Sequence, residues 1–325
     1  MTASTTRTTT AAKVRKPWTS RTAAVGAIAV AGAMLLTACG DQTDGGKESP
    51  TTASTQGAPL HDLLPQAIQD KGVIKVGSDI AYAPVEFKDK DGKTTGIDPD
   101  LADAMGKQLG VKFQFENGVF DTLVTGLRAK RYDIAMSAMT DTKDRQEGVE
   151  GGKKVGEGVD FVDYFTAGVS IYTPKGKDQG INGWDDLCGK KLVVQRNTVS
   201  NDLAKDQSTK CTTEGKKAIT IEAFDNDQQA QTRLRGGGAD AGSADSPIAA
   251  YAVKTSGGGN DFQIVGEAVE AAPYGIAVAK GNDQLTKALQ TAMNAIIKNG
   301  EYKKVLAKWG AEAGAVPEAV INGGS

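Results

Sequence analysis

Histidine and cysteine are scarce in this sequence, whose 325 residues include one histidine and three cysteines. The single His61 rules out a histidine cluster for zinc and leaves no basis for a serine, histidine and aspartate triad. No Cys-x-x-Cys spacing occurs, which argues against thiol redox catalysis. We therefore expect neither a metal site nor a cofactor, and the common zinc-dependent and triad enzymes are excluded.

A hydrophobic run long enough to span a membrane is also lacking. The longest apolar stretch, residues 23–36, falls short of the roughly 20 residues that a spanning helix needs. It follows a segment with five basic and no acidic residues and leads into Leu36-Thr37-Ala38-Cys39, a lipobox. This order predicts a lipoprotein signal peptide at residues 1–38, with cleavage before Cys39 and lipid on its thiol. The basic segment has no Arg-Arg pair, which favours the general secretory route.

Excess positive charge is absent from the mature chain. The signal peptide removes five positive charges, so the net charge changes from −2 to −7. Such a chain is not expected to bind nucleic acid. Residues 39–59 have no apolar periodicity and are rich in Gly, Thr and Ser, so we interpret them as the lipidated cysteine and a flexible tether. The remaining length suits one large or two modest domains.

The other two cysteines, Cys188 and Cys211, are an even number in a compartment that export makes oxidising. We predict that they form a structural disulfide. In the chain-entropy model, closing a loop of this size stabilises a fold by roughly 3 kcal/mol.

Strand and helix patterns alternate in two successive units. The predicted strands are residues 73–77, 111–115 and 132–136 in the first unit and 191–195, 219–224 and 239–243 in the second. The predicted helices begin at Asp98, Phe120, Val199, Asp227 and Ser246, and two more span 284–298 and 301–309. We interpret Asp98 as the N-cap of the first helix, with Pro99 at its first position.

Two units of this kind imply two α/β lobes with parallel sheets rather than one continuous sheet. The extended segments at residues 166–172 and 268–278 are interpreted as hinge crossings. Lobe 1 is therefore expected to comprise residues 60–168 with 270–325, and lobe 2 residues 169–269.

Two local patterns resemble binding loops without meeting their requirements. The glycine-rich stretch 148–158 lacks the phosphate-loop spacing and no clear helix follows it, so we interpret it as a mobile surface loop. Residues 89–92 have two acids at the spacing of a calcium loop, but the rest of that loop is missing and Asp-Gly is typical of a turn.

The residues that follow the strands are the candidates for a binding site, because ligands of open α/β sheets bind at the carboxyl ends of strands. These candidates, with the start of the second helix, are Asp79, Tyr82, Phe120, Ser137, Ala138, Thr140, Arg145, Asn197, Thr198 and Asp245. One arginine, two acids, two aromatic rings and several hydroxyls are what a zwitterion with a side chain needs.

At these positions the chain resembles the polar amino-acid substrate-binding proteins of ABC importers, over about residues 68 to 310. The resemblance rests on residues 82–87, 96–102, 133–140 with Arg145, 191–198, 273–280 and 299–310. It implies a periplasmic-binding-protein-like fold of type II, with two α/β lobes joined by two hinge strands and the ligand cleft between them. A lipidated cysteine fits, since such receptors of Gram-positive bacteria are tethered to the outer face of the membrane.

The resemblance also implies roles for the candidates. Arg145 matches the arginine that clamps the ligand α-carboxylate, and its planar fork of donors suits a carboxylate. Thr140 and Thr198 match residues whose N–H and hydroxyl groups complete that carboxylate site. Ser137 and Asp245 match the positions that accept hydrogen bonds from the α-ammonium group.

The remaining candidates concern the ligand side chain and the rim of the carboxylate site. Tyr82 and Phe120 match the two rings that sandwich the side chain, and Asp79 lies where the family recognises its far end. Asn197 follows a strand of the second lobe. Ala138 stands where the family frequently has serine, so the carboxylate site is expected to be one hydroxyl poorer.

Each candidate also has a structural alternative. Phe120 can be a core residue, Asp245 can cap the helix that follows it, and Arg145 can form a surface ion pair worth under about 1 kcal/mol. Asp141 stands where the family often has an apolar residue. It either tunes selectivity or, as we favour, caps the short helix that positions Arg145. The stretch 148–158 is inserted relative to many relatives.

We therefore predict a lipid-anchored, monomeric receptor on the outer face of the cytoplasmic membrane of a Gram-positive bacterium, which delivers a polar amino acid to an ABC permease and is not an enzyme. Asp79 favours a cationic or amide side chain, because a second buried carboxylate would repel it. Lysine, arginine, ornithine, histidine and glutamine stay open. The alternatives are an enzyme on the same fold, such as a cyclohexadienyl or arogenate dehydratase, and a sensory lipoprotein that binds amino acids without transport.

Overall fold

The computed structural model describes residues 57–325. The predicted signal peptide, Cys39 and most of the tether lie outside these residues. No helix within residues 57–325 is both long enough and apolar enough to cross a membrane.

The central feature of the described chain is a nine-stranded mixed sheet. Its strands, in spatial order, are β11 Thr220–Phe224, β10 Lys191–Gln195, β12 Ala241–Asp245, β9 Val159–Pro174, β13 Phe262–Ala279, β6 Ile134–Ala135, β1 Val73–Ser78 and β5 Lys112–Asn117, and β14 Val320–Ile321 pairs with β9. The smaller sheets are β2 Ala81–Tyr82 with β3 Glu86–Lys88 and β4 Thr94–Thr95, and the hairpin of β7 Val149–Glu150 with β8 Lys153–Lys154.

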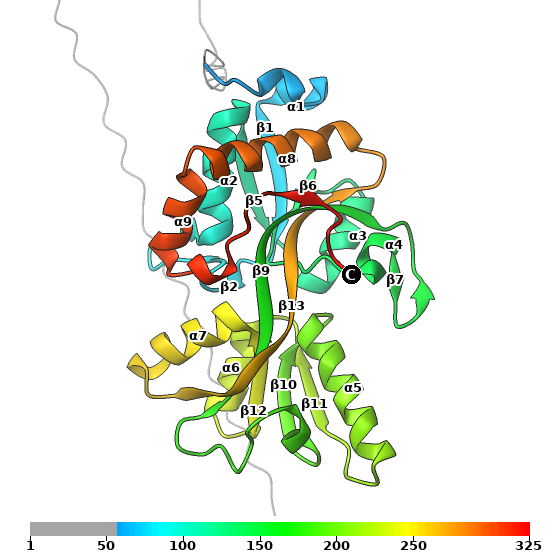
Figure 1. Cartoon of the computed structure of the whole chain (residues 1–325), viewed down its shortest axis with the longest axis vertical. Coiled ribbons are helices and arrows are strands. Elements are labelled where there is room, and N and C mark those ends of the chain that lie inside the picture. Colours follow the sequence, from blue (N-terminus) through cyan, green and yellow to red (C-terminus); the bar gives the residue numbers. More distant parts are fainter. Residues whose placement is uncertain (1–56) are drawn as a thin grey trace, which may run out of the picture. The chain divides into compact units, whose positions relative to one another are not determined.

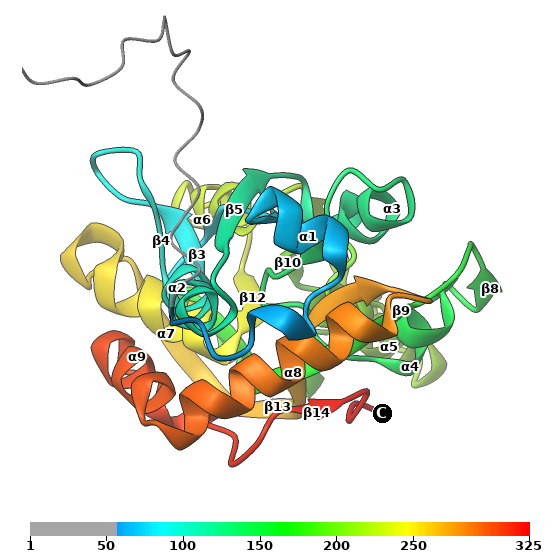
Figure 2. The same cartoon turned by 90° about the horizontal axis from the view of Figure 1, so that it is seen from above.

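Helices cover both ends of this sheet. The α-helices are α1 Gln66–Lys71, α2 Ile97–Leu109, α3 Leu123–Arg128, α4 Lys143–Glu147, α5 Val199–Thr213, α6 Asp227–Arg235, α7 Ser246–Thr255, α8 Asp283–Lys298 and α9 Glu301–Trp309. Helices α2, α8 and α9 contact one another beside the β1 end, and Figure 2 shows α8 and α9 following each other along one side. Helices α5, α6 and α7 lie at the β10 end (Figure 1).

Strands β9 and β13 connect the two ends of the sheet. They run antiparallel to each other over 16 and 18 residues, and Figure 1 shows them as the long green and orange ribbons. Strand β9 also pairs with β12, and β13 pairs with β6, so the hydrogen-bonded ladder is unbroken. The predicted α/β class with two connecting strands is confirmed. The expectation of two separate sheets is wrong, because the hinge segments are longer than their local pattern indicated and join both ladders.

The predicted lobe boundaries, 168/169 and 269/270, fall inside these two strands. The register between β9 and β13 shifts between Val265 and Val269, between Val269 and Ala272, and between Tyr274 and Gly275. Irregular pairing weakens a ladder locally. The boundaries stay predictions, and the irregular stretch is where bending between the lobes is expected.

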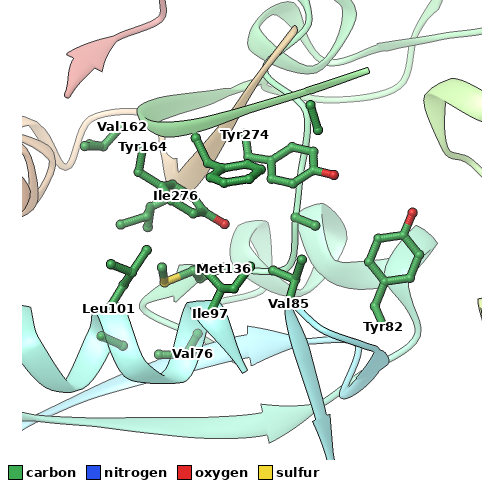
Figure 3. Packing of buried hydrophobic residues seen from close by; sticks show 14 of the residues in the cluster. Val76, Tyr82, Val85, Ile97, Leu101, Met136, Val162, Tyr164, Tyr274 and Ile276 are labelled. Carbon is green, nitrogen blue, oxygen red and sulfur yellow. The ribbon is translucent and has the colours of Figure 1, made fainter. Parts of the chain in front are cut away.

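The largest core cluster packs α2 against the β1 end of the sheet and continues to Val193 and Ile248 at the β10 end. Figure 3 shows Val76, Ile97 and Leu101 in this cluster, with the hydroxyl groups of Tyr82 and Tyr274 pointing away from the aliphatic side chains. Tyrosine hydroxyls need a polar partner when they are buried. These two rings therefore mark the border between the apolar core and a polar region.

One local prediction needs correction. Helix α2 begins at Ile97 with Gly96 as its N-cap, and Asp98 is a fully buried residue inside it. Its carboxylate accepts from the Tyr164 hydroxyl at 2.6 Å, so it serves the core instead of the helix amides. The stretch 148–158, predicted to be a mobile surface loop, contains the β7–β8 hairpin, and its mobility stays a prediction.

The predicted turn at residues 89–92 is present. The carboxylate of Asp89 accepts from the N–H groups of Asp91 and Lys93, at 2.9 and 2.8 Å, and Gly92 has a φ of 77°. These contacts close the turn.

The predicted disulfide between Cys188 and Cys211 is confirmed. It links Cys188, which lies shortly before β10, to Cys211 in helix α5. The two cysteines are 23 positions apart in the sequence. Its contribution is expected to be structural, because it ties a helix to the sheet that the helix covers.

Replacing both Cys188 and Cys211 with serine is expected to lower the free energy of unfolding by about 3 kcal/mol, because the unfolded chain regains the entropy of a closed loop. The melting temperature should fall by roughly 6 °C or more. Thermal and urea denaturation of the two proteins measure the difference, with reduced wild-type protein as the control. An unchanged unfolding midpoint would contradict a structural role for the disulfide.

Candidate ligand-binding site

The carboxyl ends of strands from both lobes meet around a small cavity of about 10 Å³, the room of roughly one water molecule. Its lining residues are Tyr82, Phe120, Ala138, Thr140, Arg145, Gln195, Thr198, Val199 and Asp245. Seven of them were predicted from the sequence. The predicted residues Asp79, Ser137 and Asn197 lie next to the cavity and do not line it.

Arg145 lies between the two lobes. One of its terminal nitrogens donates to the carbonyl oxygen of Thr140 at 2.7 Å, and the other donates to that of Asn197 at 3.0 Å. Its guanidinium carbon is 5.4 Å from the centre of the Phe120 ring. Burial lowers the pKa of this guanidinium, while Asp202 and Asp245 act in the opposite direction. Arg145 is therefore a partly desolvated cation, and it forms no ion pair with another residue of the range 57–325.

Helix α4 carries Arg145 and is capped by Thr142. The Thr142 hydroxyl accepts from the N–H of Arg145 at 3.3 Å. Asp141, the predicted cap, is fully buried and its carboxylate binds other partners. That carboxylate accepts from Gln146 at 2.7 Å and from the N–H of Gly324 at 2.8 Å.

On the opposite lobe, Asn197 and Thr198 form the entry into α5. Asn197 has a φ of 59°, a left-handed conformation that asparagine tolerates better than most residues, and its carbonyl points to Arg145. Thr198 is the N-cap of α5, since its hydroxyl accepts from the N–H of Asn201 at 3.2 Å. The N-terminus of a 15-residue helix thus reaches the cavity, where it favours negative charge.

Asp245 ends β12 and precedes α7 without capping it by its side chain. Its carboxylate accepts from the Tyr274 hydroxyl at 2.7 Å, and its N–H donates to the Tyr82 hydroxyl at 3.3 Å. Burial raises the pKa of Asp245 to about 6, although the two tyrosines and Arg145 act in the opposite direction. The helix-cap alternative for Asp245 is therefore wrong, and its carboxylate is buried at the cavity.

The two predicted aromatic residues both line the cavity. Tyr82 is 6% exposed and Phe120 is 8% exposed. Phe120 starts a short 3-10 helix, Phe120–Thr122, and also packs in a core cluster with Leu123. Phe120 therefore packs in the core, as the structural alternative expects, and also lines the cavity. Its role beside a ligand side chain stays a prediction.

Asp79 and Ser137 form a buried layer behind the lining residues. The Ser137 hydroxyl accepts from the N–H of Asp79 at 2.9 Å and donates to Glu86 at 2.7 Å. The Asp79 carboxylate accepts from the side-chain amide of Gln195 at 2.6 Å, which joins the two lobes. Burial raises the pKa of Asp79 to about 6, Asp121 adds to the effect and the Gln195 hydrogen bond opposes it. The Ser137 hydroxyl thus supports Asp79 directly.

Gln195, Val199 and Tyr274 were not predicted. Gln195 is the last residue of β10, and it is a buried polar residue that follows the apolar run Leu192 to Val194. That change from apolar to polar at the end of a buried strand was the available signal. Tyr274 lies inside β13, where the sequence pattern gave no indication that its hydroxyl reaches Asp245.

Two further buried acidic residues, Glu86 and Asp98, lie next to Ser137 and Ala138. Burial raises the pKa of both, well above the ordinary value for Glu86 and to about 7 for Asp98. Residues 57–325 contain no group of three or more histidine, cysteine or acidic side chains arranged to hold a metal ion.

Residues 74–312 match the model of the family described as bacterial extracellular solute-binding proteins, family 3. The arginine-binding protein ArgT of Corynebacterium glutamicum is 34% identical over 264 residues, which cover 81% of this chain and 82% of that protein. A probable histidine-binding protein of Neisseria gonorrhoeae is 31% identical over 286 residues, with 87% and 93% covered.

Solved structures of similar proteins include an ancestral arginine-binding protein bound to arginine, with a TM-score of 0.66 and 35% identity over 73% of this chain and 98% of that one. Another is an ancestral amino acid-binding protein described as a precursor of cyclohexadienyl dehydratase, with a TM-score of 0.65 and 34% identity over 75% and 97%. The sequence-based resemblance is thereby confirmed. Since the family match spans most of the described residues, the chain belongs to the bacterial extracellular solute-binding proteins of family 3.

Proposed function

We propose that this protein captures a cationic amino acid, with arginine as the first candidate, and delivers it to an ABC permease. The observation that carries the proposal is the charge at the cavity. Asp79 and Asp245 are buried carboxylates on opposite lobes, whereas Arg145 is the only cation among the lining residues. A ligand with one carboxylate and two positive groups balances this set, since its carboxylate takes Arg145 and its cations take the two aspartates.

A third buried acidic residue adds to the negative charge near the cavity. Asp227, at the start of α6, is buried, and its pKa is raised to about 7 by burial, with Asp245 and Asp79 adding to the effect. One of its carboxylate oxygens has no hydrogen-bond partner within the described part of the chain. A third acidic group near the site favours a cationic side chain over an amide, because a neutral ligand leaves this charge without compensation.

The proposed roles follow the geometry. Arg145 has five N–H donors, and hydrogen bonds to Thr140 and Asn197 use only two of its nitrogens. The guanidinium thus retains donors for an α-carboxylate, which the N-terminus of α5 beside Thr198 also attracts. Asp245 is proposed to accept from the α-ammonium, Tyr82 and Phe120 to flank the side chain, and Asp79 with Gln195 to bind its far end.

Capture requires the lobes to separate. A cavity of about 10 Å³ cannot hold an amino acid, and its lining comes from both lobes. We propose that bending at the irregular stretch of β9 and β13 opens the cavity and that ligand contacts on both sides close it again. The closed form is then the state presented to the permease.

The proposed setting is the outer face of the cytoplasmic membrane. A lipid on Cys39 and the tether at residues 39–59 would hold a monomeric receptor near its permease and raise its effective concentration there. Labelling cells with a radioactive fatty acid tests this part of the proposal. Label on the wild-type protein and none on a Cys39→Ala variant is the expected result.

A panel of ligands tests the binding function. Arginine, lysine, ornithine, histidine and glutamine are compared with citrulline, the neutral counterpart of arginine, and with glutamate. A ligand at about 1,000 times its dissociation constant should stabilise the protein by about 4 kcal/mol, or roughly 8 °C or more in melting temperature. We expect arginine to give the largest shift and glutamate none. The absence of any shift across a full amino-acid panel would refute the proposed function.

The similarity to a precursor of cyclohexadienyl dehydratase keeps one enzymatic alternative open. Incubation of the purified protein with prephenate or arogenate distinguishes it, because product formation would favour a dehydratase. Loss of amino-acid uptake in cells that lack the protein would separate a transport receptor from a sensory lipoprotein.

A further inference from the structure

The segment of residues 320–324 follows the part of the chain that matches the family model. It begins with β14, in which Val320 pairs with Asp163 and Ile321 pairs with Val162 of β9. It continues along β9, since Asn322 and Phe161 exchange two hydrogen bonds at 3.1 and 2.8 Å. The segment therefore lies on lobe 1 as an added edge of the sheet.

Beyond the strand, two successive N–H groups bind two buried carboxylates. The N–H of Gly323 donates to Asp163 at 2.8 Å, and the N–H of Gly324 donates to Asp141 at 2.8 Å. Asp141 and Asp163 are 0% and 2% exposed. Burial of a carboxylate is costly unless hydrogen bonds compensate it, so these two amides stabilise the two neighbouring acidic side chains. Burial raises the pKa of Asp163 to about 7, and neighbouring Asp141 adds to the effect.

The same contacts reach the helix that carries Arg145. Gln146 donates both to the Asp141 carboxylate at 2.7 Å and to the carbonyl oxygen of Gly324 at 3.3 Å. The N–H of Asp141 donates to the carbonyl oxygen of Pro273 in β13 at 2.8 Å. Helix α4 has only five residues, so its own hydrogen bonds hold it weakly. Its orientation therefore depends on these external contacts.

The close approach of the segment requires glycine. A Cβ atom at Gly324 would lie 2.0 Å from the backbone oxygen of Asp141. Backbone cannot move aside as a flexible side chain does, so any larger residue at this position has to displace the segment from Asp141. Replacing Gly324 with alanine, which adds one carbon atom, therefore tests this contact.

We propose that the 320–324 segment positions Arg145 and that it acts through Asp141 and Gln146. The inference rests on the proposed function, in which Arg145 binds the ligand carboxylate. The carboxylate of Asp141 gives the segment its anchor, because it accepts from the N–H of Gly324. The segment and Asp141 form one device that fixes the lobe 1 side of the carboxylate site.

Gly324→Ala tests the proposal, with Gly183→Ala as the matched control. Gly183 has a φ of 179° and no atom within 4 Å of an added Cβ, so alanine fits there without strain. We expect Gly324→Ala to weaken arginine binding about tenfold in titration calorimetry, because the guanidinium loses its fixed orientation. Gly183→Ala should leave the dissociation constant within twofold of the wild-type value.

A double-mutant cycle separates positioning from general damage. In an Arg145→Ala background, Gly324→Ala should cause no further loss of affinity in titrations extended to millimolar arginine, since the positioned group is already absent. An equal loss in both backgrounds, or an affinity of Gly324→Ala within twofold of wild type, would overturn the proposal.

Hydrogen exchange gives a readout that needs no ligand. In Gly324→Ala, amides of residues 143–148 should exchange at least about tenfold faster than in the wild type, whereas those of α5 should be unchanged. Unchanged exchange at α4 would overturn the positioning role whatever the ligand is. Failure of the wild-type protein to bind any amino acid would instead refute the proposed function.

Discussion

Arg145→Ala is expected to weaken amino-acid binding by about 2 to 5 kcal/mol, or roughly 30- to 4,000-fold in the dissociation constant. The loss is large because the substitution leaves the ligand carboxylate buried without its cation. Thr140 and Thr198 remain on either side, but their hydroxyl and N–H groups carry no full charge. Titration calorimetry with the ligand that gives the largest thermal shift measures the change.

Arg145→Lys is the matched control for charge. Lysine keeps the positive charge but lacks the planar fork, and it cannot bind Thr140, Asn197 and a carboxylate together as the guanidinium can. Its affinity should lie between those of the wild type and Arg145→Ala. An affinity of Arg145→Ala within twofold of wild type would mean that the ligand carboxylate binds elsewhere. The melting temperature without ligand should change little, which separates a loss of binding from a loss of folding.

The residues of the cavity could be predicted where the chain places them directly after buried strands. Thr198 comes shortly after the apolar run Leu192 to Val194, and Asp245 comes shortly after the predicted strand at residues 239–243. Parallel strands bring such positions to one edge of a sheet. Arg145 lies further along the chain than the other candidates after its strand, and its role as the carboxylate clamp came from the family resemblance. Local periodicity could not indicate that role, because a five-residue helix has too few positions to define a face.

The errors in the sequence analysis concern side chains whose partners are distant in the sequence. Asp98 and Asp141 both precede or begin a helix, where aspartate is typical of an N-cap. Their actual partners, Tyr164 and Gly324, are 66 and 183 positions away. A local pattern gives the types of group that a carboxylate can bind, and tertiary packing decides which of them it meets.

The continuous sheet was missed for a related reason. Only the central parts of β9 and β13 looked extended, and their pairing with β12 and β6 depends on both lobes being in place. Gln195 was overlooked because it ends a strand instead of following one. Its hydrogen bond to Asp79, 116 positions away, shows that the last residue of a strand can contribute as much as the loop after it.

The affinity for a cationic ligand is expected to fall as the pH is lowered through about 6. Asp79 and Asp245 each have a pKa raised to about 6 by burial, and a cation binds their ionised forms. Protons therefore compete with the ligand below that value. Between pH 7.5 and pH 5 the dissociation constant should rise by roughly 100-fold if both groups must ionise, or by about tenfold if only one must.

In the unliganded protein, these two groups should make the folding stability change with pH in the direction opposite to the affinity. A carboxyl whose pKa is raised by folding contributes most to stability while it is protonated, and that contribution is lost as the pH rises through about 6. The ligand reverses the effect, because its positive groups compensate the charges that burial disfavours. The thermal shift caused by a saturating cationic ligand should therefore be larger at pH 7.5 than at pH 5.

Asp245→Asn separates the contributions of the two carboxylates. Asparagine keeps an acceptor for the Tyr274 hydroxyl but cannot ionise, so one of the two titrating groups is removed while the hydrogen bond survives. The affinity of the variant at pH 7.5 should be lower than that of the wild type. Its dissociation constant should then rise only about tenfold between pH 7.5 and pH 5. Calorimetry in two buffers of different ionisation enthalpy should also show fewer protons released on binding than in the wild type. A wild-type dissociation constant that is the same at pH 5 and pH 7.5 would mean that neither buried carboxylate meets a ligand cation, and the preference for basic amino acids would then need another origin.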